Sequence, residues 1–335
     1  MKKKFRFGEF VAEKLIKSVA FISFAVIVLI FVFVFREAIP IFFQKEKSVT
    51  STEKIEYETY GDETQNLSLD NSSESGKIKN KDEASFENLT GKEWQPIGDS
   101  PKYGLLPLFI GSLKVTLISI LFGAPIAILA AIFTALFLPP KIKEVVKPII
   151  ELLASFPSVV IGFFALMTLA TLFQNIFHYT YRLNAFVGGI AMALAVIPII
   201  YTVTEDALTA VPHHFSEASL ALGATKWQTA LFIILPAAFP GIFAALLLGF
   251  GRAFGETMIL LMATGNAPIT SVNIFEPVRT LSATIGAEMA EVVFGEVHYS
   301  VLFLIGSLLF VITFIINAIA EFYVRAKLMK RFRGE

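Results

Sequence analysis

Six long apolar stretches divide this chain, and they constrain its fold more than any other feature. They cover residues 18–36, 106–137, 149–174, 185–204, 228–262 and 299–322. A helix that spans a bilayer needs about 20 apolar residues, and two of the stretches are long enough to include tilt, an interfacial part or a break. The chain is 55% hydrophobic with a mean hydropathy of +0.68, which is too apolar for a soluble domain of its size. We therefore expect an all-α polytopic membrane protein with six transmembrane helices.

Basic residues near the ends of these stretches predict the orientation of the chain, because loops rich in Lys and Arg stay in the cytoplasm. They gather before the first stretch, in the loop 138–148 and after the last stretch: Lys2, Lys3, Lys4, Arg6, Lys14, Lys17, Lys141, Lys143, Lys147, Arg325, Lys327, Lys330, Arg331 and Arg333. All three groups lie on the same side only if the number of spans is even. The first span is too long for a signal peptide and lacks a small-residue cleavage site. We expect an uncleaved anchor and two cytoplasmic termini.

The chain divides into three parts. Residues 1–39 form a cytoplasmic N-terminus with the first anchor, and residues 104–335 form a core of five spans. Between them lies an external polar insertion, residues 40–103, rich in Ser, Asn, Glu, Asp and Lys and poor in aromatic residues. It shows no steady helical or strand period, which predicts a flexible or loosely folded segment. Its acidic balance makes it a poor collector of anions.

Composition excludes several functions. The absence of cysteine excludes disulfides, thiol catalysis and cysteine-ligated metals. His213 and His214 are adjacent and diverge on a helix, so we expect no metal site. The net charge of zero gives no footprint for nucleic acid. The chain has no Gly-x-x-x-x-Gly-Lys-Ser/Thr loop and no cluster of catalytic side chains in its spans, so we expect neither an enzyme nor a bound cofactor.

Two charged residues, Arg252 and Glu256, lie inside the fifth apolar stretch in the sequence GFGRAFGET. Each costs about 2.5–3.5 kcal/mol in a membrane span, so such groups pair or face a polar cavity. Because they are four residues apart, we expect them to share one helix face and to pair. The pair is either a structural lock or part of a translocation path, in which Glu256 holds Arg252 toward an anion. A guanidinium suits a tetrahedral oxyanion because its planar fork donates two parallel hydrogen bonds.

A polar segment rich in Ala and Gly, residues 217–236, separates two spans and falls on the cytoplasmic side. It reads EASLALGATKWQTALFIILP, and its skeleton is Glu217-Ala218, Gly223 and Pro236. Small residues let another surface approach closely, Gly223 lets the chain turn, and Trp227 is an apolar anchor. The segment is either an ordinary interfacial helix or, within a loop of about residues 205–227, a helix offered to a partner.

That skeleton resembles the "EAA" loop in the membrane subunits of binding-protein-dependent ABC importers. In that family the loop docks into a groove on a cytoplasmic ATPase. The resemblance therefore implies that Glu217, Ala218, Gly223 and Pro236 couple this chain to an ATPase, present in two copies, which binds the ATP. Ser219 stands where the family pattern usually has Ala, a change between two small residues.

The segment Arg252–Thr257, with MILLMATGNAPI after it, looks like the Arg-x-x-Gly-Glu-Thr segment of phosphate-specific ABC importer permeases. The resemblance implies that Arg252, Glu256 and Thr257 lie in the substrate path. The C-type (PstC-like) subunit is favoured by residues 105–113, 156–163 and 285–291, and the likeness covers about residues 5–36 and 104–330.

This family resemblance implies a type I ABC importer permease core in a bacterial inner membrane. The chain would form half of the path for inorganic phosphate. Its partners would be a second, PstA-type permease as heterodimer, the ATPase, an external phosphate-binding protein and membrane lipid.

Other readings stay open at this point. The chain is alternatively a permease for another oxyanion such as molybdate or sulfate, a membrane anchor without a pore, or, more remotely, a membrane enzyme. Among the remaining polar residues, Glu205 and Asp206 are expected to form a solvated cap on the fourth span. The external loop 263–297 contains Arg279, which either meets the anion or belongs to a docking surface for the binding protein.

Overall fold

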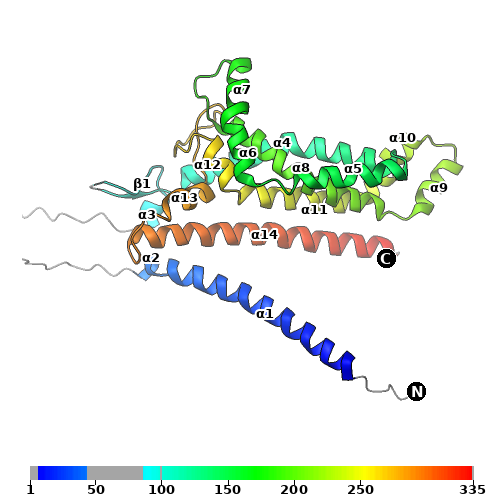
Figure 1. Ribbon diagram of the computed structural model, residues 1–335, viewed down its shortest axis with the longest axis horizontal. Coiled ribbons are helices and arrows are strands. Elements are labelled where there is room, and N and C mark those ends of the chain that lie inside the picture. Colours follow the sequence, from blue (N-terminus) through cyan, green and yellow to red (C-terminus); the bar gives the residue numbers. More distant parts are fainter. Residues whose placement is uncertain (1–6, 44–85, 99, 334–335) are drawn as a thin grey trace, which may run out of the picture.

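The computed structural model describes residues 7–43, 86–98 and 100–333, and nearly all of these residues that belong to a regular element are helical. Four long helices lie side by side along one direction (Figure 1): α4 (Leu106–Leu136), α8 (Ala185–Thr209), α11 (Leu235–Phe254) and α14 (Val297–Arg333). A fifth, α1 (Phe7–Ala38), contacts α14 and diverges from it toward the N-terminus. Within the described residues, 6 stretches are long and apolar enough to cross a membrane: Glu13–Ala38, Leu106–Leu136, Ser158–Phe177, Ala185–Thr209, Lys226–Phe254 and Val297–Phe322. The predicted number of spans is confirmed.

The core lies between α4, α8 and α11. Val115 of α4, Val196 and Ile200 of α8, and Ala245 of α11 are all fully buried in one apolar cluster. Glycine lets these helices approach closely, since a Cβ on Gly249 would lie 2.6 Å from Cδ1 of Ile200. Close backbone approach through small residues is how transmembrane helices gain van der Waals contact without a hydrophobic driving force.

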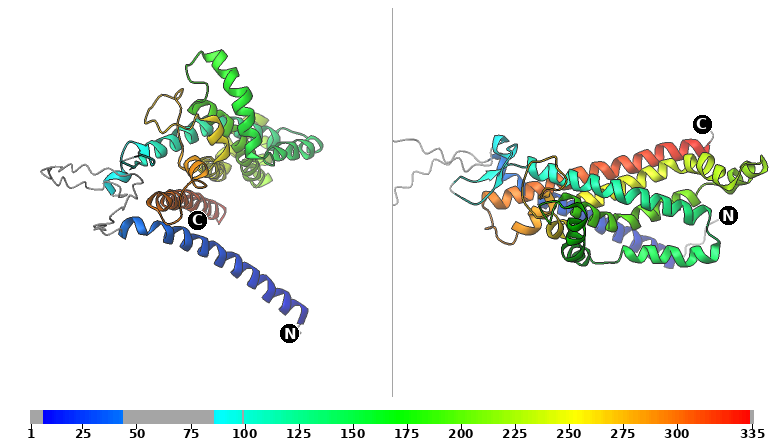
Figure 2. Two further views of the ribbon diagram at one scale, coloured as in Figure 1. Left: turned by 60° about the vertical axis from the view of Figure 1, so that its left-hand side comes forward. Right: turned by 90° about the horizontal axis from the view of Figure 1, so that it is seen from above.

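The predicted third span, 149–174, is wrong at its beginning. Residues expected to be a loop form the amphipathic helix α5 (Pro140–Leu153), which ends before Phe156-Pro157. Pro157 is the N-cap of a new helix, which is where proline is tolerated because its missing N–H would have no partner. That stretch comprises α6 (Ser158–Phe164), the π-helical turn η1 (Ala165–Leu169) and α7 (Ala170–Phe177). It stands across the other long helices in Figure 1 and is seen nearly end-on in the right-hand view of Figure 2.

Part of the polar insertion after the first span is folded. After α2 (Pro40–Phe43), the described chain resumes with α3 (Phe86–Leu89) and an antiparallel pair, β1 (Trp94–Gln95) and β2 (Lys102–Tyr103). Trp94 and Tyr103 face each other across this pair and are only 5% and 3% exposed. The expected loose segment is therefore wrong for residues 86–103, because these two aromatic rings give the hairpin its own buried contacts. Residues 44–85 of the insertion lie outside the described residues.

The two ends of the bundle carry different elements. At one end, α9 (His213–Ala221) and α10 (Lys226–Thr229) project beyond the long helices, near the C-terminal end of α14 and on the side where α1 begins (Figure 1). The opposite end carries the hairpin, α12 (Met258–Ala263) and α13 (Leu281–Glu288). A second π-helical turn, η2 (Ala230–Ile234), joins α10 to α11 just before Pro236, which has no N–H to continue the regular ladder.

Candidate functional site

The fifth span ends within the charged motif. Helix α11 ends at Phe254, and the backbone N–H of Gly255 closes its last turn onto the carbonyl of Gly251 at 3.3 Å. Glu256 and Thr257 therefore lie in the link before α12, not on the helix face of Arg252. The Oε1 of Glu256 accepts from the backbone N–H of Met258 at 3.2 Å. The predicted Arg252–Glu256 pair is wrong, since the structure has no ion pair between these two described residues.

Helix α13 holds this link in place. The hydroxyl of Ser282 donates to the carbonyl oxygen of Glu256 at 2.5 Å. A Cβ on Gly286 would lie 2.5 Å from Cγ2 of Thr257, so only glycine permits this approach. The backbone N–H of Leu281 in turn donates to Oγ of Ser112 in α4 at 2.9 Å. The break is thus a defined structure, tied through α13 to the core helix α4.

Arg252 points away from the protein core. Its side chain is exposed, and no hydrogen bond or ion pair to it is found among the residues that the structure describes. Asn317 of α14 lies beside the same turn, because a Cβ on Gly251 would be 3.2 Å from its Oδ1. Asn317 is also exposed. Together they present a cation and an amide, which are both able to donate hydrogen bonds to an oxyanion. Asn317 was not identified from the sequence. The signal that could have found it is an amide side chain within the sixth apolar stretch, residues 299–322.

A buried carboxylate organises the end of the bundle that carries the hairpin. Oε1 of Glu288 accepts from Nε1 of Trp94 at 3.1 Å and from Arg279, and Oε2 lies 2.9 Å from Nε2 of His298. Burial alone would raise the pKa of Glu288, but hydrogen bonds from His298 and Trp94 and the charge of Arg279 outweigh it and lower that pKa. Arg279 also donates from Nε to Oδ1 of Asn266 at 3.1 Å.

The contacts of Arg279 within this network give it a structural role. Its side chain is 17% exposed and its donors are directed at Glu288 and Asn266, so the expectation that it meets an anion in the loop is not supported by its geometry. A cavity of about 1040 Å³ opens beside the network, between the hairpin and the start of α14, with Glu291 and Glu296 on its lining. Of the two sequence-based alternatives for Arg279, a docking surface in this loop stays a prediction.

A second buried carboxylate, Glu205, lies at the opposite end of the bundle. The expected solvated cap is wrong for Glu205, which is 1% exposed, although its neighbour Asp206 is 62% exposed. Glu205 forms ion pairs with Lys143 and Lys147 of α5, the latter at 2.7 Å. The hydrogen bond to Glu205 raises the pKa of Lys147, although partial burial opposes it. Lys143 and Lys147 are four residues apart on one helix face, which is the sequence signal for this contact.

The coupling segment, α9 and α10 with the turn between them, is a compact unit. Gly223 has φ of +87° in the turn, a conformation that side chains with a Cβ rarely adopt. Thr225 and Gln228 form a capping box at the start of α10. The hydroxyls of Ser219 and Thr229 lie 3.0 Å apart and join the two helices. Ser219, where the family pattern usually has Ala, therefore adds a hydrogen bond within the unit.

The residues of this segment that the sequence singled out occupy different places. Glu217 and Ala218 are exposed on α9, whereas Pro236 lies in the first turn of α11. Two large apolar side chains also project here: Leu222 is 90% exposed, and Trp227 is 60% exposed and lies against Phe137 with ring centroids 4.4 Å apart. Leu222 was not identified from the sequence, because one leucine among many carries no periodic signal.

Comparison with known proteins shows the family to which this chain belongs. Residues 123–328 match the family model described as binding-protein-dependent transport system inner membrane component. This chain belongs to that family. It is 37% identical over 230 residues to the probable ABC transporter permease protein YqgH of Bacillus subtilis (strain 168), with 69% of this chain and 74% of the relative covered. It is 33% identical over 256 residues to the phosphate transport system permease protein PstC of Mesorhizobium japonicum, covering 71% and 77%.

A solved structure of the MetNI methionine ABC transporter in an inward-facing conformation is also similar, with a TM-score of 0.49 at 19% identity over 67% of this chain and 94% of that chain. The family match contains both the coupling segment and the motif Arg252–Thr257. The protein is therefore a multi-pass membrane subunit of a binding-protein-dependent importer, with an all-α fold of six spans. A family of transport-system membrane components agrees with the expectation that this chain works as a permease subunit.

Proposed function

We propose that this subunit forms half of a translocation path for inorganic phosphate and that Arg252 meets the anion on that path. The observation that carries the proposal is an exposed arginine without an ion pair among the described residues, in the last turn of a membrane-spanning helix. Such a charge facing lipid costs about 2.5–3.5 kcal/mol, so its exposed side suits an aqueous path between two subunits. Relatives named as phosphate transport system permeases favour phosphate as the anion.

The motif residues then have separate roles. Arg252 supplies charge and the planar fork for a tetrahedral oxyanion, and Asn317 beside it supplies an amide donor. Glu256 fixes the start of α12 by accepting from the N–H of Met258. Thr257 lies against Gly286 of α13 and so sets how closely α13 approaches the link. Arg252 is thus the substrate contact, and Glu256 and Thr257 are positioning residues at the break.

The path needs partners, and the exposed surfaces indicate where they bind. We infer a second, PstA-type permease as heterodimer, facing the open side of the fifth span. Two copies of a cytoplasmic ATPase bind the ATP and contact the coupling segment through Glu217, Ala218 and the exposed Leu222. An external phosphate-binding protein docks at the hairpin end. This assignment puts the coupling segment and both termini in the cytoplasm, and it requires no cofactor on this chain.

Motion at the ATPase reaches the core through contacts that the structure shows. The Ser219–Thr229 hydrogen bond makes α9 and α10 move together, and α10 continues through η2 into α11. The pairs of Glu205 with Lys143 and Lys147 connect α5 to the end of α8. A shift of the coupling segment is thereby transmitted to α11, whose far end carries Arg252. This is alternating access by rigid-body movement of packed helices.

Uptake of labelled phosphate by the assembled transporter in proteoliposomes tests the proposal. Arg252→Gln should abolish uptake without preventing assembly, whereas Arg36→Gln, which changes another exposed arginine at the end of α1, should leave uptake unchanged. Normal uptake by a fully assembled Arg252→Gln transporter rejects Arg252 as the substrate contact. Competition by molybdate or sulfate that equals competition by unlabelled phosphate would favour a permease for another oxyanion.

A further inference from the structure

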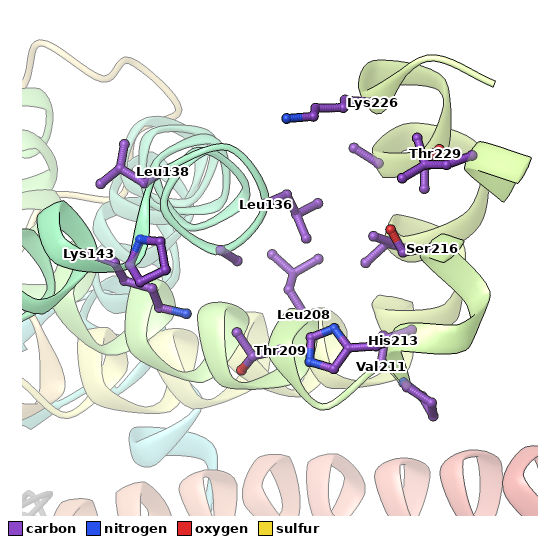
Figure 3. Close-up of a pocket in the computed structure, with 16 residues that line it drawn as sticks. Leu136, Leu138, Lys143, Leu208, Thr209, Val211, His213, Ser216, Lys226 and Thr229 are labelled. Carbon is purple, nitrogen blue, oxygen red and sulfur yellow. The ribbon is translucent and has the colours of Figure 1, made fainter. Parts of the chain in front are cut away.

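A second cavity, of about 510 Å³, lies at the coupling end of the protein (Figure 3). The end of α4, the start of α5, the end of α8 and the coupling segment surround it. Its walls are apolar where Leu136, Leu208 and Leu220 line it. Lys143, His213 and Lys226 line it as well, and none of the described lining residues is acidic. Its size and its mixture of apolar walls with a few polar groups are typical of small-molecule sites.

The charges around this cavity do not cancel. Lys143 is committed to Glu205, and the nearby Lys147 is shared between Glu205 and Asp206, so these four groups balance. Lys226 adds a further positive charge for which the described residues provide no ion pair. In Figure 3 its side chain extends from α10 across the opening toward Leu136. The cavity therefore has a net positive edge.

Polar donors complete the lining. Ser216 of α9 lines the cavity, and Figure 3 shows its hydroxyl on the side of Thr229 of α10. The imidazole of His213 lies next to Leu208 and Val211 at the base of the coupling segment. The lining therefore offers an anion a lysine ammonium, a hydroxyl or an imidazole at different points of the cavity, while apolar walls make up the rest. Ion pairs are stronger in such partly enclosed surroundings than in bulk water.

We propose that this cavity binds a phosphate-bearing anion, which is either the headgroup of an anionic phospholipid or free inorganic phosphate. Basic pockets between helices at the cytoplasmic surface recognise phospholipid headgroups, and the apolar walls suit the glycerol and upper acyl chain. Lysine is also an effective point charge for free phosphate. The site is distinct from the translocation path, because Lys226 and Arg252 lie at opposite ends of one continuous helical stretch, about 39 Å apart at 1.5 Å per residue.

Occupancy of this site has a mechanical consequence. Lys226 belongs to α10 of the coupling segment, whereas Lys143 belongs to α5, which is paired to α8. An anion between them ties the coupling segment to the core helices. Binding therefore changes how firmly movement of α9 and α10 is transmitted to the spans.

Two binding measurements on the purified full-length chain test the proposal and separate the two sources. One is equilibrium dialysis with labelled inorganic phosphate. The other is native mass spectrometry of chain taken from phosphatidylcholine membranes with or without phosphatidylglycerol, which counts the lipids retained. Lys226→Gln should weaken the binding at least about tenfold, the loss expected for one charge-assisted hydrogen bond. Lys226→Arg should restore it. Lys141→Gln is the matched control, because Lys141 is an exposed lysine of α5 outside the cavity lining.

Each outcome decides the proposal. Phosphate binding that depends on Lys226 supports the site with free phosphate as its ligand, and retention of phosphatidylglycerol that depends on Lys226 supports it with lipid. Neither effect, or an equal loss in Lys141→Gln, overturns it. A third result also overturns the cavity site: phosphate binding is lost in Arg252→Gln and unchanged in Lys226→Gln, and no lipid is retained. That result would still agree with the proposed translocation path.

Discussion

The two ends of the bundle each contain a buried glutamate, and the two are held differently. Glu205, at the coupling end, is 1% exposed and binds two lysines of the amphipathic helix α5. Glu288, at the hairpin end, is 9% exposed and binds an arginine, a histidine and a tryptophan from three separate segments. In both places a buried charge fastens a peripheral element to the spans. Arg252, by contrast, is exposed and has no such partner among the described residues.

This contrast separates two paired, buried charges from an exposed charge without an ion pair among the described residues. Buried charges are costly unless they are paired and hydrogen-bonded, and both glutamates meet that requirement. An arginine that stays unpaired in a spanning helix is tolerated only where water or another subunit covers it. We therefore expect substitutions of these three residues to lower the free energy of unfolding by different amounts. The largest loss is expected at Glu288 and the smallest at Arg252.

The largest effect is expected for Glu288→Ala. The change leaves Arg279, His298 and the indole N–H of Trp94 without their shared acceptor in a buried site, so it should lower the free energy of unfolding by about 3–5 kcal/mol. Thermal or denaturant unfolding of the purified protein in nanodiscs measures this. Glu291→Ala, an exposed glutamate three residues along the chain, should change little. Equal losses in both variants would mean that the network does not fasten the hairpin.

The same network predicts a dependence on acid. The unfolded chain titrates Glu288 near its ordinary value of 4.5, whereas the folded pKa is lower, so the folded state holds this proton more weakly. Its stabilisation is therefore complete above about pH 4.5 and is lost as pH falls through the folded pKa. Arg279 and His298 are the charged groups that face it. The stability difference between wild type and Glu288→Gln should be constant above that pH and shrink below it. A difference that grows in acid would contradict the lowered pKa.

A smaller loss is expected for Glu205→Ala, about 1–3 kcal/mol. The side chains of Lys143 and Lys147 are 27% and 30% exposed, so they are able to turn toward water when their partner is removed. Asp206→Ala removes an exposed partner of Lys147 and should cost at most about 1 kcal/mol. Unfolding under the same conditions compares the two. If Glu205→Ala proved more harmful than Glu288→Ala, the ability of the cations to reach solvent would not explain the difference between the two ends.

The sequence predicted the spans well because hydropathy is a local property, and the 6 stretches follow from it directly. The buried glutamates were missed because their partners are distant along the chain: Lys147 is 58 positions from Glu205, and Trp94 is 194 positions from Glu288. The hairpin of β1 and β2 was missed for a different reason, because strands of two residues are too short to show a period in the sequence. For the motif Arg252–Thr257, spacing alone did not reveal that the helix ends at Phe254, where α13 packs against the link.

The smallest effect on stability is expected for the exchange of Arg252→Glu with Glu256→Arg. Because the structure does not pair these residues, the exchange breaks no buried ion pair, and the free energy of unfolding should change by only about 1 kcal/mol, from the lost hydrogen bond between the Met258 N–H and Glu256. Uptake of phosphate should nevertheless be absent, since a carboxylate at residue 252 would repel the anion where a guanidinium attracted it. Unfolding and labelled-phosphate uptake are to be measured on the same assembled preparations.

The corresponding exchange of Arg279→Glu with Glu288→Arg is the matched control, because there the partners Trp94 and His298 are positioned to bind a carboxylate. That exchange should cost several kcal/mol. Full uptake by the Arg252–Glu256 exchange variant would show that the charge of Arg252 is not needed to contact the anion. Arg252 would then be a structural charge like Glu205 and Glu288, and exposure would not distinguish it from them.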